Sequence, residues 1–148
     1  WDYELFTRAS GIQAMDLVAR KMMDGGEAAG RLLDEIQRHA EKVRCKLPEM
    51  AEPVWQAAET LREGVEWLVA QSDLNERFAG AVPFAKAFAR VLGGHYHLCA
   101  AAADPEGPRM KMAGFYIKRL LPEHESLLIA SRGGAEGLYE LTPDEMAA

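Results

Sequence analysis

The longest stretch with almost no charge constrains the fold of this chain most. Residues 78–103 read FAGAVPFAKAFARVLGGHYHLCAAAA, and their only charged side chains are Lys86 and Arg90. These two residues are four positions apart and therefore lie on one side of a helix. We predict a buried helix with one wet stripe, around which the other helices pack. The residues expected to face the other helices are Val82, Ala85, Phe88, Ala89 and Leu92.

This apolar stretch is long enough to cross a bilayer, which takes about 20 residues. It is interrupted by Pro83, by the pair Gly93 and Gly94, and by two histidines, and charged segments flank it on both sides. We therefore expect a core helix and no membrane span.

Apolar residues recur at helical spacing in the rest of the chain. Helices are predicted at about 11–23, 27–44, 52–72 and 109–130 in addition to the central one. Ala, Leu, Glu, Arg and Met dominate, whereas β-branched residues are scarce, so no strand is expected. The predicted fold is all-α, a bundle of four or five helices.

Prolines, glycines and capping residues set the expected boundaries. Ser10 and Asp73 are candidate N-caps, and 104–108 (DPEGP) is the strongest turn signal in the chain. Pro83 predicts a kink or a fresh helix start, and Pro122 predicts a kink or a break. Residues 133–148 are expected to form a mobile tail or to lie over a neighbouring surface.

Composition limits the class of protein. A chain of 148 residues fits one domain, and its net charge of −6 argues against nucleic-acid binding. Cys45 and Cys99 lack metal or disulfide spacing, so we expect packing residues in a reduced, cytoplasmic compartment. The chain begins without Met and without a signal peptide, and we interpret it as a piece of a longer protein.

No catalytic or metal-binding motif stands out. His95 and His97 are two residues apart on a helix and point in nearly opposite directions, so they cannot share one metal ion. We expect one ring to face the core with a nitrogen bonded to a backbone carbonyl, and the other to reach water. The cluster at 123–125 (EHE) follows Pro122 and is expected to be a solvated turn, because HExxH is absent.

Several segments together resemble one enzyme family. The segment SGIQAMDLVARK at 10–21 resembles the end of the catalytic core of acyl-CoA dehydrogenases, usually written YEGTTGIQAxDLxxRK. The remainder resembles the extra helical C-terminal domain of a bacterial subset that includes methylthiopropionyl-CoA dehydrogenases. The segments that carry this second resemblance are MDGG at 23–26, VPFAKAFARVLGG at 82–94, AGFYIKRLLPEHESLL at 113–128 and GAEGLYEL at 134–141.

The resemblance implies a division of the chain and a cofactor for the intact enzyme. Residues 1–23 would end the catalytic core, 24–132 would form the C-terminal helical bundle, and 133–148 would be the tail. In this family FAD takes a hydride from the β-carbon of an acyl-CoA while a carboxylate removes the α-proton. Gln13 matches the glutamine of GIQ, so it either contacts the flavin in the intact enzyme or is a polar residue at a helix N-terminus.

The sequence departs from the family at the catalytic carboxylate. Thr7 stands where many members have the glutamate, and its hydroxyl cannot act as a base near neutral pH. Glu4 lies three residues too early to replace it. Three explanations remain open: the parent enzyme uses another base, it has lost activity, or its first residues are foreign to the family pattern. No catalytic residue is therefore assigned.

The resemblance favours a structural or oligomerisation role beside the rest of the acyl-CoA dehydrogenase chain. Exposed apolar strips should make the fragment self-associate, and the expected assembly is a symmetric dimer. The residues expected on these strips are Ile12, Met15, Val18, Phe115 and Tyr116. The alternatives are a stand-alone helical interaction module without enzymatic activity and, more remotely, an independent enzyme with a site at His95, His97 or His124.

The first prediction is that this chain alone binds no flavin. Of the flavin site that the resemblance implies, only Gln13 is retained, and the family builds that site across several domains and subunits. The purified chain should be colourless after incubation with FAD and gel filtration. A flavin absorption band that co-elutes with the protein would contradict the prediction.

Overall fold

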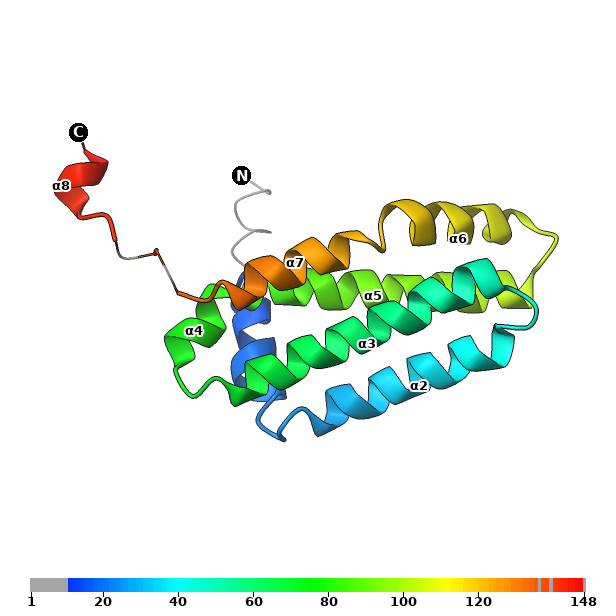
Figure 1. The fold of residues 1–148 in the computed structure, drawn as a ribbon, viewed down its shortest axis with the longest axis horizontal. Helices are drawn as coiled ribbons and strands as arrows, with labels where there is room; N and C mark the ends of the chain where they lie inside the picture. Colours follow the sequence, from blue (N-terminus) through cyan, green and yellow to red (C-terminus); the bar gives the residue numbers. More distant parts are fainter. Residues whose placement is uncertain (1–10, 136, 139, 148) are drawn as a thin grey trace.

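The computed structural model describes residues 11–135, 137–138 and 140–147 and contains no strand in these ranges. Residues 11–16 are α-helical and lead into a π-helical turn. The elements that follow are η1 (Leu17–Lys21), α2 (Glu27–Val43), α3 (Pro48–Ala70), α4 (Leu74–Ala79), α5 (Ala81–Ala103), α6 (Pro108–Arg119), α7 (Glu123–Arg132) and α8 (Pro143–Met146). The prediction of an all-α bundle is confirmed, and its long helices are α2, α3, α5, α6 and α7 (Figure 1).

Helix α5 is the central element, as predicted. It packs against α3, against α6 and α7, and at one place against α2. Figure 1 shows α3 and α5 side by side, with α2 along α3 and with α6 and α7 lying in a row along the far side of the bundle. The large side chains of α5 that are almost fully buried are Phe84, Val91 and Leu98.

The predicted inner face of α5 is confirmed in part, because Ala85, Phe88 and Leu92 pack against the core. Val82 is 40% exposed and Ala89 is also exposed, whereas Phe84 and Ala87 are buried. The error came from treating both charges as solvent-facing. The guanidinium of Arg90 instead lies against α7, where its Nη2 is 2.8 Å from Oε2 of Glu123, so the side of the helix that carries Arg90 is partly covered by protein.

The inner faces of α2 and α3 agree with the predicted periodicity. Leu33 and Ile36 of α2 and Leu61 and Leu68 of α3 are completely buried. Helix α3 begins at Pro48, four residues before the predicted start, because proline is well tolerated at the first helical position, where its missing N–H would have no partner in the helix. The apolar faces of α2 and α3 therefore pack against each other.

Pro83 and Pro122 mark a helix start and a helix break, whereas Pro53 lies inside α3. Helix α5 begins at Ala81, so Pro83 lies in its first turn and marks a fresh start. Pro122 lies between α6 and α7 and marks a break. Asp73 caps α4 by accepting a hydrogen bond from the backbone N–H of Asn75 at 2.9 Å, as expected. Ser10, the other candidate cap, lies outside the described residues.

The C-terminal segment contains one short helix that the sequence pattern did not predict. Helix α8 starts with a capping box, in which Thr142 and Glu145 exchange hydrogen bonds. All residues of α8 are exposed, and Figure 1 shows it apart from the bundle. That 133–148 form a mobile tail stays a prediction. No helix in the described part of the chain is long and apolar enough to span a membrane.

The junction between α4 and α5 generates the second prediction. A Cβ atom at Gly80 would overlap with the backbone oxygen of Ser131 at the end of α7. Gly80→Ala should therefore lower the free energy of unfolding by about 1–3 kcal/mol, because backbone cannot move aside as a flexible side chain can. The measurement is urea unfolding followed by circular dichroism.

The matched control is Gly114→Ala in the interior of α6. A Cβ atom there would come no closer than 3.4 Å to a neighbour, the terminal methyl of Met50. Alanine also favours the helix by about 0.5–1 kcal/mol over glycine. Gly114→Ala should be neutral or stabilising, and equal effects of the two substitutions would contradict the packing of α7 on this junction.

Candidate functional site

Gln13 lies at a surface groove between the N-terminal helix and α5. The groove has a volume of about 580 Å³. The N-terminal helix contributes Gln13, Ala14, Asp16, Leu17 and Lys21, and α5 contributes Val82, Ala85, Lys86 and Ala89. The exposed stripe of α5 that begins with Val82 therefore forms one wall of a groove.

The groove combines apolar walls with positive charge at its edges. Leu17 and Val82 supply apolar surface, and Lys21 and Lys86 supply two ammonium groups. The wall that carries Gln13 includes η1, a π-helical turn, which is a rare element found often at functional sites. Such a groove suits an apolar protein segment that carries acidic groups at its edge. Asp16, the carboxylate among its lining residues, is paired with Arg20 at 3.2 Å.

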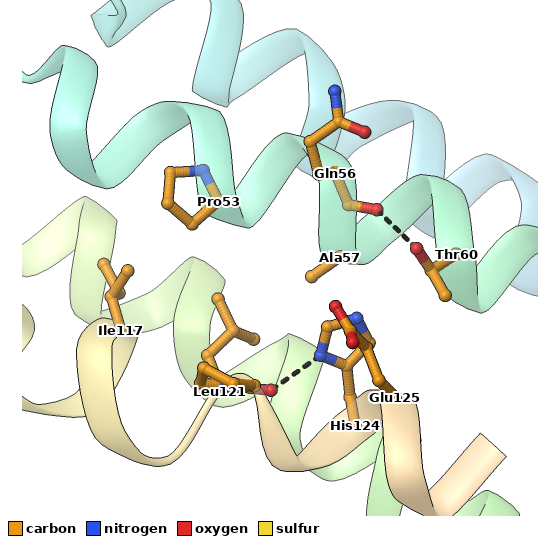
Figure 2. Close-up of a pocket in the computed structure, with 9 residues that line it drawn as sticks. Pro53, Gln56, Ala57, Thr60, Ile117, Leu121, His124 and Glu125 are labelled. Atoms are coloured by element: carbon orange, nitrogen blue, oxygen red, sulfur yellow. Dashed lines mark hydrogen bonds between the residues drawn. The ribbon is translucent and has the colours of Figure 1, made fainter. Parts of the chain in front are cut away.

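A second cavity lies between α3 and the junction of α6 with α7 (Figure 2). It has a volume of about 140 Å³. Figure 2 shows the ring of His124 between Leu121 and the α3 side chains, with Glu125 beside it. The lining residues are Pro53, Gln56, Ala57, Thr60, Ile117, Leu121, Pro122, His124 and Glu125.

His124 is a buried residue and not part of a solvated turn, so that expectation is wrong for this residue. Its side chain is only 5% exposed. Nδ1 is 2.6 Å from the backbone oxygen of Leu121 and must donate, which leaves Nε2 as an acceptor in the neutral ring. Nε2 is buried and has no hydrogen-bond partner among the described residues. The cavity therefore offers one acceptor to a small donor such as a water molecule.

His95 and His97 point to opposite flanks of α5, as predicted. His95 is buried, whereas the ring of His97 stacks on Tyr116 of α6 with 4.5 Å between the ring centroids. The prediction that the buried ring bonds to a backbone carbonyl is wrong for His95. Its ring nitrogens lie 3.7 and 3.9 Å from Sγ of Cys99.

A third histidine joins this pair from another helix. His39 of α2 faces His95, with 5.4 Å between the ring centroids, and its nitrogens lie 3.6 and 3.7 Å from Sγ of Cys99. One ligand atom from each of these three residues fits within a span of 4.8 Å. We call His39, His95 and Cys99 the His–Cys cluster.

Burial favours the neutral forms of His95 and Cys99. It lowers the pKa of His95, an effect that the nearby His39 increases and Glu35 opposes. Burial likewise raises the pKa of the Cys99 thiol. Neutral imidazole is the form that ligates metals.

The His–Cys cluster was missed in the sequence because His39 belongs to a different helix. The available signal was the spacing of His95 and Cys99, which places both on one face of α5. The expectation that both cysteines are packing residues is wrong for Cys45, which is exposed, whereas Cys99 is half-buried beside two histidines. Both cysteines are free.

The comparisons with known proteins identify one family. A family model described as acetyl-CoA dehydrogenase C-terminal like matches residues 32–142, from α2 into the C-terminal segment. No curated protein and no solved structure matches the chain. The match begins after η1, so Gln13 and the segment at 10–21 lie outside it.

The third prediction concerns the pH dependence of stability that His95 causes. Its pKa is lower in the folded chain than the ordinary 6.5 of an exposed histidine, so below 6.5 the unfolded chain binds more protons than the folded one. Stability is therefore greatest above this value and falls as the pH is lowered through it.

Urea unfolding between about pH 8 and about pH 5 tests this prediction. A chelator in the buffer removes any contribution of a metal. The loss of stability toward acid should be smaller in His95→Gln than in the unaltered chain. If the free energy of unfolding falls with pH equally in the two proteins, the assigned burial of His95 is contradicted.

Proposed function

Because the chain belongs to the acetyl-CoA dehydrogenase C-terminal like family, we propose that it is the C-terminal helical domain of an FAD-dependent acyl-CoA dehydrogenase. The complete enzyme would oxidise the Cα–Cβ bond of an acyl-CoA thioester, with FAD as hydride acceptor. The resemblance of 82–94 and 113–128 to the bacterial subset favours a thioester of the methylthiopropionyl-CoA kind. The two free cysteines suit a cytoplasmic enzyme.

The domain would act by docking and not by catalysis. The observation that carries this proposal is the groove between the N-terminal helix and α5, whose walls are apolar and which lies beside further exposed apolar side chains. Ile12 is 69% exposed and Met15 is 43% exposed. Such side chains are typical of a surface that another part of an assembly covers. We propose that the catalytic core of the same enzyme covers this groove.

Gln13 is the residue of this surface that would reach the cofactor. It is exposed at the groove, so it can meet a ligand that the catalytic core holds against this face. In the complete enzyme its amide would donate to or accept from the flavin. In the isolated chain it has no such ligand to contact.

A second apolar patch favours association between copies. Met112 and Phe115 on α6 are 59% and 63% exposed, and they line a shallow hollow with His97 and Tyr116. The expectation that Val18 lies on such a strip is wrong, because Val18 is completely buried. Tyr116 is half-buried, and its hydroxyl donates a hydrogen bond to the backbone oxygen of Arg90. We propose that this patch forms a symmetric dimer contact.

The same patch also favours the alternative, a stand-alone helical interaction module. The two proposals differ in what happens in the complete protein encoded by the reading frame around this sequence. A dehydrogenase should retain FAD, and an acyl-CoA should bleach the flavin absorbance. An interaction module should do neither.

The fourth prediction tests docking at the groove with two matched substitutions. Val82→Glu puts a charge on the groove wall, and Ile129→Glu puts the same charge on α7, where Ile129 is 71% exposed and outside the groove. In the isolated chain both should change the free energy of unfolding by less than about 0.5 kcal/mol, because both side chains are exposed. In the complete protein only Val82→Glu should reduce bound FAD and disturb assembly.

The readouts are the ratio of flavin to protein absorbance and the mass from light scattering. Equal behaviour of the two variants in the complete protein would contradict docking at the groove. Complete protein without flavin in its unaltered form would contradict the proposed dehydrogenase itself.

A further inference from the structure

The His–Cys cluster brings three metal-ligating side chains together from two helices. His95 and Cys99 lie one turn apart on α5, and His39 faces them from α2. His39 and Cys99 are half-buried and His95 is buried, so the cluster lies just beneath the surface, where an ion can enter from solvent. The cluster is separate from the groove and from the cavity at His124.

The distances are close to those of a tetrahedral zinc site. Zinc bonds of about 2.3 Å to sulfur and about 2.0–2.1 Å to nitrogen place the two ligand atoms about 3.5 Å apart. Sγ of Cys99 is 3.6–3.7 Å from the nearer nitrogens of His39 and His95. One ligand atom from each of the three residues lies within 4.8 Å of the other two, so the side chains need only small shifts to reach a shared centre.

The chemistry of the three ligands selects the metal. One thiolate and two imidazoles are borderline-soft ligands, which suit zinc and exclude calcium and magnesium, whose ligands are oxygens. From these observations we propose that His39, His95 and Cys99 bind one zinc ion between α2 and α5. This proposal revises the expectation of no metal, which compared His95 only with His97.

A fourth side chain favours a cation at this place. Glu35 lies one turn before His39 on α2, and its negative charge acts on both His95 and Cys99. It therefore lowers the energy of a cation bound between them. Zinc binding replaces the proton of the Cys99 thiol, and that proton is released to solvent as the zinc–thiolate bond forms.

The bound ion would join two helices that make few other contacts. Helix α2 packs chiefly on α3 and meets α5 over a much smaller surface. A ligand that binds only the folded state stabilises it in proportion to its affinity. Zinc at the cluster would fasten α2 to the central helix and stabilise the end of the bundle around His39.

The test uses Co²⁺ as a spectroscopic substitute for zinc on chelator-stripped protein. A cobalt–thiolate bond gives a charge-transfer band in the near ultraviolet, and we expect one Co²⁺ per chain, displaced by one Zn²⁺. Cys99→Ser should abolish this band, whereas Cys45→Ser should leave it unchanged. His39→Gln and His95→Gln should each weaken binding at least about tenfold, the range already typical of losing an outer-shell partner. His97→Gln is the matched histidine control and should bind as the unaltered chain does.

Stability provides the second measurement. One equivalent of Zn²⁺ should raise the melting temperature of the unaltered chain and of the two controls, but not that of Cys99→Ser or His39→Gln. Circular dichroism in chelator verifies that each variant is folded, and if His95→Gln unfolds, the comparison of Cys99→Ser with Cys45→Ser still decides. A band that persists in Cys99→Ser, the absence of any band, or an equal zinc effect in all variants would overturn the site and leave a hydrogen-bonded cluster.

Discussion

The packing of α5 against the other helices is the interaction on which the rest of this structure depends. An apolar helix of this length would not remain exposed in water, and its burial against α3 on one side and α6 and α7 on the other forms most of the core. Two features allow the close approach. The glycines at 93–94 leave room for Tyr116 and Leu121, and Arg90 pairs with Glu123 across the contact with α7. The remaining helices are arranged by their contacts with this one element.

The two ends of α5 carry different chemistry. Val82, Lys86 and Ala89 near its start form a wall of the groove, whereas His95 and Cys99 near its end face α2. Docking of a catalytic core would therefore act on one end of the central helix, and a bound zinc ion would act on the other.

The sequence predicted most of the fold because charge and periodicity coincide in α2 and α3. Charged residues regularly alternate there with Leu33, Ile36, Leu61 and Leu68, so only one face of each helix can be buried. In α5 there are two charges, and one of them pairs within the protein, so charge alone could not locate the inner face. Prolines helped to place helix starts because their missing donor is best tolerated in a first turn, although Pro53 lies inside α3 and Pro83 and Pro122 each left two outcomes open.

The candidate sites could be predicted less well, since they depend on contacts between distant segments. No spacing rule relates His39 to Cys99, and only the packing of α2 on α5 brings them together. His124 was expected in water because it belongs to a charged cluster after Pro122, yet its ring is buried between Leu121 and α3 (Figure 2). Glu125 beside it is exposed, and Glu123 pairs with Arg90. Gln13 was singled out by resemblance, and its place at the groove gives it a physical setting.

The claim that the groove is a docking surface is tested most directly by hydrogen exchange. The rate of amide exchange in 11–21 would be compared between the isolated chain and the complete protein, with the turn at 44–47 as an internal reference. Docking at the groove should make exchange in 11–21 slower in the complete protein than in the isolated chain, while the reference turn exchanges at the same rate in both. If 11–21 also exchanges at the same rate in both proteins, the groove is not a docking surface.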